Sequence, residues 1–370
     1  MEQIIIVAAL TIFFLRTLIF LIGSVIEKRK NNKIVRNDFT PTVSVIIPAR
    51  NEEKNIARCL DSVAANIYRG FYEIIVVNDR SDDGTASILK EYSSANGIIK
   101  VVTINKDSDK KNLRGKPGAL QAGIDIAQGD IILMTDADCI VPKNWIETMV
   151  KPYKDENAGL VAAFSHTFTK RIFDRIQAVY WIYLHVMGSA GFGYGIPLGC
   201  IGNNLSVRTS TLRKLGGYGK IRFSVTEDLS LLQAVKAEGM RVHYLCYPET
   251  TVETVPSRNL KEFLRQLHRW SIGGLELGWK AAVFVISSIA LWIGIITSLI
   301  YLDFLFLAII LAVKIAGDFV LIVPAMYAIS RSNIVKWVPL AIMFFFFLEL
   351  FVPVQLLDKK VIWKEQVFKT

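Results

Sequence analysis

Two aspartates, Asp136 and Asp138, stand two positions apart directly after the apolar run 131–135. In a turn that follows a buried strand, two such carboxylates can converge on one hard divalent cation, and Mg²⁺ and Mn²⁺ prefer oxygen ligands of this kind. An isolated D-x-D triplet is usually a solvated turn, but its position at the end of an apolar strand favours a site. We therefore predict that Asp136 and Asp138 bind Mg²⁺ or Mn²⁺.

A further acid, Asp79, lies just past the apolar run 73–77. A carboxylate at that place can accept hydrogen bonds from a nucleobase or a ribose hydroxyl. The neighbouring Asp82 and Asp83 are expected only to start the next helix, because short acidic residues are common there. Asp79 is therefore predicted to contact a ligand.

The segment Gly115-Lys116-Pro117-Gly118 places a lysine between glycines at an expected junction of loop and helix. Backbone amides at a helix start, together with the lysine ammonium, can hold a diphosphate. The segment is not a Walker A loop, because the leading glycine spacing and the Ser or Thr after the lysine are missing.

Thr226, Glu227 and Asp228 precede an expected amphipathic helix over 229–237. A threonine followed by acids is an ordinary helix start. An acid in such a place can also serve as a general base if it faces a reacting hydroxyl group. The residue types alone leave both interpretations open and favour the helix start.

The segment 266–270 lies just before a long apolar tract. Arg269 can pair with phosphate oxygens through two hydrogen bonds, and the flat face of Trp270 can contact a sugar or a lipid. Anchoring at the membrane boundary is the alternative, above all for the tryptophan.

These residues follow a regular alternation of short apolar runs and helix-period segments. The spacing predicts strands over 43–47, 73–77, 98–104 and 131–135, and helices over 52–66, 83–92 and 118–127. Such alternation is typical of an α/β domain with a parallel sheet and helices on both faces. In such sheets ligands bind beyond the carboxyl ends of the strands. The loops expected at that edge are 48–53, 78–84, 114–118 and 136–139.

Apolar residues are concentrated at the two ends of the chain. The protein has 370 residues, 52% of them hydrophobic, and a mean hydropathy of +0.37. A membrane span needs about 20 apolar residues, so the stretch 4–22 predicts one span. The tract 281–357 predicts about three more, over 281–301, 304–328 and 338–357. A signal peptide is disfavoured for the first stretch, which lacks a basic region before it and a cleavage site after it.

The predicted organisation has five parts. They are an N-terminal transmembrane anchor (1–24), a basic juxtamembrane linker (25–40), a cytoplasmic domain (41–275), a C-terminal transmembrane region (281–357) and a basic tail (358–370). Basic residues after the first span place the N-terminus outside and the central domain in the cytoplasm. Three further spans would put the basic tail outside, against the same rule. The last segment, with Pro353 and Gln355, is alternatively a re-entrant or interfacial helix.

The formal net charge is +10, and much of the positive charge lies after the first span, in 106–116 and in 258–269. We assign the first cluster to anionic membrane lipids. No nucleic-acid partner is expected, because no nucleic-acid motif accompanies the charge. The four cysteines form no C-x-x-C pair, which fits reduced thiols in a cytoplasmic domain.

Charged residues interrupt the apolar stretches, among them Arg16, Lys314 and Asp318. Arg16 is expected to face a partner helix or to extend toward the membrane surface. Lys314 and Asp318 are four residues apart, so they can pair on one helix face.

The motifs occur in one order, and this order resembles the family 2 glycosyltransferases that have a GT-A fold. The resemblance covers about 41–275, and several motifs in series are far more specific than any one of them. The matching segments are 44–53, the Asp79 segment, Gly115-Lys116, Asp136-Ala137-Asp138, Gly202-Asn203-Asn204, Thr226-Glu227-Asp228 and Gln266-x-x-Arg269-Trp270.

The resemblance implies a donor site for a nucleotide sugar, UDP-linked by expectation. The residues that it assigns to donor binding are Ala49, Glu52, Asp79, Lys116, Asp136, Gln266, Arg269 and Trp270. Asp79 would contact the base, and Lys116 the diphosphate or ribose. Asp136 and Asp138 would bind the nucleotide and the metal, while the 266–270 segment closes the site.

The resemblance also implies an inverting reaction with Asp228 as the general base. Asp228 would deprotonate an acceptor hydroxyl, which attacks the anomeric carbon opposite the departing nucleoside diphosphate. The metal ion and Arg269 would neutralise the charge that develops on this leaving group.

The full Q-x-x-R-W motif is usual in relatives that polymerise cellulose, chitin or hyaluronan, and it or a close variant occurs in glycolipid-forming relatives. Four spans per chain would enclose a polymer channel only in an oligomer. We therefore predict a hexosyltransferase of the cell membrane, multi-pass, that glycosylates a lipid or lipid-linked acceptor. The alternatives are an oligomeric polysaccharide synthase with a saccharide acceptor and a non-catalytic scaffold, which would be expected to have lost some of the acids.

Three features bear on the acceptor. An apolar, aromatic helix over 172–187 either lies at the membrane interface or is a core helix. The glycine-rich stretch 188–202 is predicted to be a mobile loop over the acceptor. Asn203 and Asn204 either bind a sugar or satisfy buried backbone groups.

Overall fold

The computed structural model describes residues 2–106, 113, 115–358, 360–363 and 366–369. The chain forms two compact units, each built from separate stretches of sequence. The sheet unit comprises 28–168 and 199–256, and the helical unit comprises 1–27, 169–198 and 257–370. Parts of the predicted basic stretches 106–116 and 358–370, and Arg114 in the loop 114–118, lie outside the described residues.

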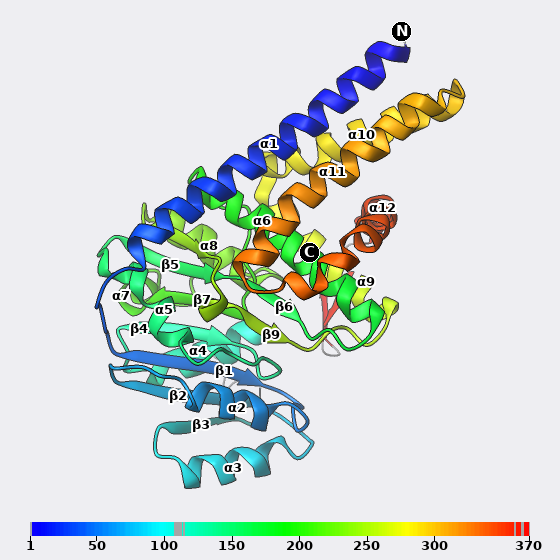
Figure 1. The fold of residues 1–370 in the computed structure, drawn as a ribbon. Coiled ribbons are helices and arrows are strands. Elements are labelled where there is room, and N and C mark those ends of the chain that lie inside the picture. The colour runs from blue at the N-terminus through cyan, green and yellow to red at the C-terminus, as the bar shows by residue number, and fades with distance from the viewer. Residues whose placement is uncertain (1, 107–112, 114, 359, 364–365, 370) are drawn as a thin grey trace. The chain divides into compact units, whose positions relative to one another are not determined.

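The sheet unit contains a seven-stranded sheet with the strand order β3-β2-β1-β4-β7-β5-β8 (Figure 1). Its strands are β1 (Val43–Ala49), β2 (Tyr72–Asp79), β3 (Ile99–Ile104), β4 (Ile131–Thr135), β5 (Ala158–Ala163), β7 (Asn204–Arg208) and β8 (Arg241–Leu245). A separate parallel pair is formed by β6 (Ser165–Thr167) and β9 (Val252–Thr254).

Among the residues described, six α-helices and two short 3-10 helices belong to the sheet unit. They are α2 (Ile56–Ala64), α3 (Thr85–Ala95), α4 (Lys116–Ile126), α5 (Trp145–Met149), α7 (Thr209–Lys214), α8 (Glu227–Ala237), η2 (Lys151–Lys154) and η3 (Pro248–Thr250). The predicted strand over 131–135 has the observed bounds, and each of the other predicted strands and helices overlaps an observed one.

The parallel sheet predicted from the first four strands is confirmed, but it is only part of the sheet. β1 pairs in parallel with β2 and β4, and β2 with β3. β7 then runs antiparallel to both β4 and β5, and β8 is parallel to β5. The full sheet is therefore mixed, and the antiparallel β7 brings the chain back beside the end of β4.

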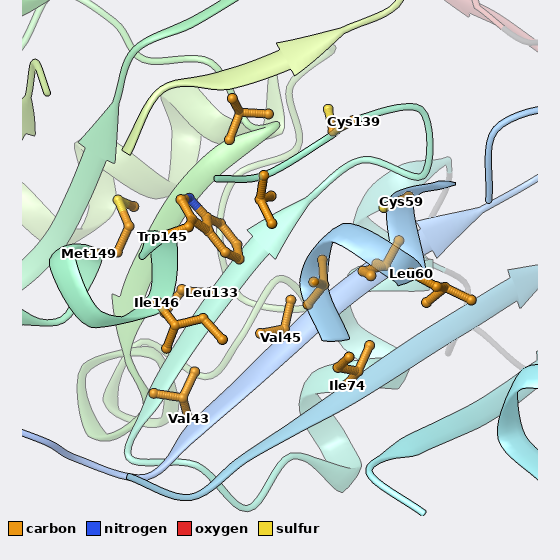
Figure 2. Packing of buried hydrophobic residues seen from close by; sticks show 14 of the residues in the cluster. Val43, Val45, Cys59, Leu60, Ile74, Leu133, Cys139, Trp145, Ile146 and Met149 are labelled. Atoms are coloured by element: carbon orange, nitrogen blue, oxygen red, sulfur yellow. The ribbon is translucent and has the colours of Figure 1, made fainter. Parts of the chain in front are cut away.

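The core of the sheet unit lies on both faces of β1, because successive side chains of a strand point to opposite faces. Val43, Val45 and Ile47 pack with residues of α2 and α5 in one buried cluster, part of which Figure 2 shows. On the other face α4 approaches so closely that a Cβ at Gly123 would lie 2.8 Å from Cγ2 of Ile46. Helices therefore cover both faces, as predicted.

The helical unit consists mainly of helices, most of which are long and apolar. They are α1 (Glu2–Ile34), whose last turns belong to the sheet unit, α6 (Ile172–Gly193), α9 (Leu260–Gly274), α10 (Ala282–Ile300), α11 (Phe304–Ala328) and α12 (Val338–Gln355). The 3-10 helices η4 (Leu275–Ala281) and η5 (Ser332–Trp337) and the strands β10 (Lys360–Trp363) and β11 (Gln366–Lys369) complete it.

Four helical segments among the described residues are long and apolar enough to cross a membrane. They are Glu2–Ile34, Leu260–Ile300, Phe304–Ala328 and Ser332–Gln355. Their positions match the predicted spans. Two stretches of the predicted domain 41–275, namely 169–198 and 257–275, pack in the helical unit.

Charged side chains join three of these helices inside the helical unit. Arg16 of α1 pairs with Asp318 of α11 at 3.2 Å and donates a hydrogen bond to the hydroxyl of Tyr183 in α6. Lys314 pairs with Asp318 at 2.8 Å and with Glu349 of α12 at 2.6 Å. The predicted pairing of Lys314 with Asp318 is confirmed, and Arg16 faces a partner helix.

The stretch 188–202 is not a loop throughout, which corrects the prediction. Helix α6 continues to Gly193 and is buried along most of its length, because small residues let α1 approach it. A Cβ at Gly193 would lie 2.0 Å from the carbonyl oxygen of Gly23. Of the two interpretations of 172–187, the structure therefore favours the core helix.

Candidate functional site

The loops that follow β1 and β2 are hydrogen-bonded to each other. The amide of Glu52 donates to Oγ1 of Thr85 at 2.8 Å, and the amide of Glu53 donates to Oδ2 of Asp83 at 3.1 Å. In return, the amide of Gly84 donates to Oε2 of Glu53 at 2.9 Å. Asp83 also accepts from the Thr85 amide at the start of α3, so its predicted structural role is confirmed.

Three of the predicted donor-binding residues lie on these strand ends. Ala49 is the last residue of β1, where it pairs with Asn78 of β2, and Asp79 is the last residue of β2. Glu52 follows in the first loop and accepts a hydrogen bond from the side chain of Asn55 at 3.0 Å. The three residues are therefore at the carboxyl edge of the sheet, where the alternation predicted a ligand.

Arg80 is a neighbour of Asp79 that sequence reasoning did not single out. Its Nε lies 3.0 Å from Oδ1 of Asp79, and its backbone is in the left-handed region with φ 55°. Asn51, in the facing loop, has φ 57°. Left-handed conformations are uncommon for residues with a Cβ, and they cluster at functional sites. The two at this edge of the sheet are therefore consistent with a ligand site there.

Asp136 and Asp138 form the turn directly after β4. The residues between and after them, Ala137 and Cys139, are buried, while both aspartates are partly exposed. The amide of Cys139 donates to the carbonyl oxygen of Asp136 at 3.1 Å and closes the turn. Both acidic side chains therefore lie at the boundary of the core, and Oδ1 of Asp138 is 3.6 Å from Sγ of the buried Cys139.

Lys116 lies between two acids, Asp136 and Glu227. Its ammonium is 2.7 Å from Oδ1 of Asp136 and 3.1 Å from Oε1 of Glu227. Its side chain is 13% exposed, that of Glu227 is 10% exposed, and that of Asp136 is 35% exposed. Burial opposes the charge of Lys116, but Asp136, Glu227 and then Asp228 outweigh it and raise the pKa of the lysine.

Asp228 occupies the first turn of α8, and its carboxylate is oriented by backbone amides. The amide of Gly202 donates to Oδ2 at 2.7 Å, and that of Leu229 donates to Oδ1 at 2.8 Å. Thr226 does not cap the helix through its side chain, since its hydroxyl bonds to that of Ser224 at 3.1 Å. The residues that start α8 therefore face the 202 loop and Lys116.

Glu227 and Gly202 are site residues that sequence reasoning did not assign. The sequence pattern predicts only that Glu227 starts a helix. Its contact with Lys116 becomes visible in the fold. Burial and then Glu227 raise the pKa of the nearby Tyr218 hydroxyl. The sequence signal for Gly202 was its place in the segment 202–204, without a stated role.

The residues present fit a divalent cation that arrives together with a phosphate group. Among the described residues no group of three or more His, Cys, Asp or Glu side chains forms a ready-made metal cage. Mg²⁺ and its analogues are usually held by one or two carboxylates plus phosphate oxygens. Asp136 and Asp138 supply such a carboxylate pair.

Asn204 has a structural role, and Asn203 is bonded inside the sheet unit. The amide nitrogen of Asn204 donates to the carbonyl oxygens of Phe164 and Thr250, each at 2.7 Å, and its oxygen accepts from Nε1 of Trp145 at 2.9 Å. Asn203 accepts from the hydroxyl of Ser165 at 3.0 Å. For Asn204, the alternative of satisfying buried groups is therefore the correct one.

Gln266, Arg269 and Trp270 lie on α9, in the helical unit, and are partly buried. The ring of Trp270 packs edge-on against Trp181 at 5.3 Å between centroids. Gln266 accepts a hydrogen bond from the hydroxyl of Ser257 at 3.4 Å. Their predicted role in closing the donor site stays a prediction.

Two family models match the chain. The model described as glycosyl transferase family group 2 matches residues 131–350, more than half of the chain. The model described as glycosyl transferase family 2 matches residues 44–213. Together they cover the sheet unit from β1 onward and most of the apolar C-terminal helices.

Two curated relatives are similar over a little less than two thirds of the chain. "Probable glycosyltransferase YdaM" of Bacillus subtilis is 31% identical over 239 residues, which are 63% of this chain and 55% of that protein. "Beta-monoglucosyldiacylglycerol synthase" of Trichormus variabilis is 27% identical over 244 residues, which are 64% of this chain and 49% of that protein. The chain thus spans about half the length of the curated relatives it matches.

A solved structure shows the same fold. The mannosyltransferase PcManGT from Pyrobaculum calidifontis, solved in complex with GDP-Man and Mn²⁺, aligns with a TM-score of 0.60 at 18% identity. The alignment covers 93% of this chain and 99% of that one. The sheet unit therefore has the GT-A fold, and the chain belongs to glycosyl transferase family group 2.

Proposed function

We propose that this protein transfers a hexose from a nucleotide-diphosphate sugar, UDP-linked by expectation, to a hydroxyl group of a membrane lipid. The observation that carries the proposal is the cluster of Lys116, Asp136 and Glu227, with Asp228 beside it on α8. Acids for a metal and a base, together with a cation for a diphosphate, are what this reaction requires. The cluster also lies at the strand ends, where the ligands of α/β sheets bind.

Asp228 is the proposed general base. Its two carboxylate oxygens are each held by one backbone amide, which fixes the orientation of the group. A carboxylate can accept the proton of an acceptor hydroxyl. The deprotonated hydroxyl oxygen of the acceptor attacks the anomeric carbon. It attacks from the side opposite the leaving nucleoside diphosphate, so the product has inverted configuration.

Donor binding is proposed for Ala49, Glu52 and Asp79 at the nucleoside and for Lys116 at the diphosphate. Mg²⁺ or Mn²⁺ bound to Asp136 and Asp138 would neutralise charge on the leaving group. The assignment of Gln266, Arg269 and Trp270 to the donor rests on the resemblance alone.

A lipid acceptor is favoured by two observations. In the described part of the chain, four helical segments are long and apolar enough to cross a membrane, where a lipid acceptor is available. The relative from Trichormus variabilis carries the name "Beta-monoglucosyldiacylglycerol synthase". We place the protein in the cell membrane by proposal, and the basic residues after the first span favour a cytoplasmic sheet unit.

Purified protein in lipid nanodiscs, incubated with a panel of labelled nucleotide sugars and Mn²⁺, tests this function. Label in an organic-extractable product, with inverted anomeric configuration by NMR, is the expected result. Label in a polymer that stays at the chromatographic origin would instead indicate a polysaccharide synthase. Absence of both transfer and donor hydrolysis with every nucleotide sugar would contradict the enzymatic function.

A further inference from the structure

The ion pairs of Lys116 point to a role that simple phosphate binding does not explain. Glu227, the more buried of its two carboxylate partners, lies 3.1 Å from the ammonium. Asp136, the more exposed partner, lies 2.7 Å away and is one of the two candidate metal ligands. The ammonium of Lys116 therefore contacts the buried Glu227 on one side and the candidate metal ligand Asp136 on its more exposed side.

This arrangement makes the ammonium a competitor of the metal ion. A carboxylate that accepts hydrogen bonds from an ammonium offers less negative charge to a divalent cation, and two cations on one carboxylate repel each other. The metal ion therefore gains the full charge of Asp136 only when the ammonium has another acceptor. A diphosphate group supplies such an acceptor, because its oxygens can accept the hydrogen bonds of the ammonium.

The backbone at Lys116 is constrained, whereas the lysine side chain is flexible. Gly115, with φ 65°, precedes the lysine, and Pro117 follows it within the first turn of α4. Proline has a fixed φ and suits this turn. The four-carbon stem of a lysine is flexible, so the ammonium can change partners without movement of the helix.

We propose that Lys116 is a resident counter-ion that keeps the empty site from taking up a free divalent cation and moves from Asp136 to the diphosphate when the donor binds. Glu227 is the positioning residue that retains the ammonium in the site. Metal and nucleotide then bind cooperatively, and the coupling acts equally in both directions. This inference rests on the proposed function and deepens it, because it predicts how the donor site fills.

Calorimetry on the full-length protein in detergent tests the proposal without turnover. The titrations are Mn²⁺ alone, UDP alone, and UDP in saturating Mn²⁺. In the unmodified protein we expect weak Mn²⁺ binding that tightens at least tenfold with UDP. In Lys116→Met we expect Mn²⁺ alone to bind at least threefold more tightly, while UDP with Mn²⁺ binds at least tenfold more weakly.

Further variants separate this role from a structural one. Glu227→Gln leaves Lys116 on Asp136 alone, so Mn²⁺ alone should bind more weakly than in the unmodified protein. Lys116→Arg keeps the charge and should not tighten Mn²⁺ binding. Lys100→Met is the matched control, because Lys100 forms a 2.6 Å ion pair with Glu73 elsewhere in the sheet unit, and it should change neither affinity.

The outcomes distinguish this proposal from the proposed function. If Lys116→Met weakens UDP binding and leaves Mn²⁺ binding unchanged, the lysine is only a diphosphate contact and the counter-ion role is wrong. Weakening of both ligands would indicate a structural role and would also overturn it. If the unmodified protein binds neither UDP nor any other nucleoside diphosphate, the proposed donor site itself is contradicted.

Discussion

Gly202 shows how one residue can control the orientation of the proposed base. Its amide donates to Oδ2 of Asp228 at 2.7 Å. A Cβ at this position would lie 3.1 Å from Cβ and 3.3 Å from Oδ2 of the same aspartate. Those distances are tight, so an alanine would displace the carboxylate by a few tenths of an ångström.

We therefore expect Gly202→Ala to lower kcat about three- to tenfold, because small misplacements of a reacting group are costly. The affinity for UDP should not change, since the base does not bind the nucleotide. Initial rates and UDP titrations measure both. Gly219→Ala is the control, because nothing lies within 4 Å of a Cβ at Gly219. Equal effects of the two substitutions on kcat would contradict the orientation role.

His243 makes a second residue-scale prediction, for stability. It is buried on β8, and neither ring nitrogen has a hydrogen-bond partner in the described part of the chain. Burial lowers its pKa to about 4, with Lys30 and Arg241 acting in the same direction and Asp155 opposing.

A histidine whose pKa is lower in the folded than in the unfolded state destabilises the fold as pH falls, because the unfolded chain binds the proton first. Stability should decrease by about 3 kcal/mol between pH 6.5 and pH 4 from this group. His243→Leu should remove that part of the pH dependence. Unfolding midpoints of the solubilised protein across this range measure it, and an unchanged pH profile in the variant would refute the assignment.

Sequence reasoning found the acids of the site but not their partners. Asp136 and Asp138 stood out because they directly follow an apolar strand, whereas Asp228 was assigned only through the family resemblance. The contacts of Lys116 with Glu227, and of Gly202 with Asp228, join segments far apart in the chain. Nothing in the local spacing of either pair indicates that the fold brings them together.

At the scale of elements, the charged residues of α1, α11 and α12 test how the helical unit is assembled. Two cations, Arg16 and Lys314, balance two anions, Asp318 and Glu349, in a connected set of ion pairs. An unbalanced charge in an apolar environment is costly, and breaking a buried pair typically costs about 3–5 kcal/mol. Net charge, more than any single contact, should therefore decide stability.

We expect Arg16→Leu alone to lower the thermal stability of the detergent-solubilised protein strongly. The double variant Arg16→Leu with Glu349→Gln leaves the Lys314–Asp318 pair intact and should recover most of the loss. Arg16→Leu with Lys314→Leu leaves two carboxylates and should be the least stable. Heating followed by size-exclusion chromatography gives the order, and equal stability of the two double variants would show that charge balance is irrelevant.

The fold was predictable where apolar strands and amphipathic helices alternate regularly along the sequence. β1 to β4 and the helices between them have strong alternation between apolar strands and polar-faced helices. The sequence pattern did not predict β5, β7 and β8, and the antiparallel direction of β7 depends on pairing with β4 and β5. The end of α6 was missed because glycines suggested a loop, whereas they permit close packing against α1.

At the scale of the whole molecule, the charge distribution predicts the topology. Basic residues follow the first apolar stretch, so the sheet unit should face the cytoplasm and the N-terminus should face outward. Cysteine substitutions at two exposed positions, Gln3→Cys and Lys90→Cys, test this with a membrane-impermeant maleimide. The first should react in intact cells and the second only after permeabilisation; the reverse pattern would contradict the orientation.

The central claim is that the sheet unit catalyses sugar transfer with Asp228 as the general base. The most direct measurement compares the unmodified protein with Asp228→Asn for transfer of label from a nucleotide sugar to lipid, with UDP affinity measured in parallel. Because general base catalysis contributes about 10²- to 10⁴-fold, transfer should fall by that factor while UDP binds within about threefold of the normal affinity. Transfer by Asp228→Asn at the normal rate would contradict the account.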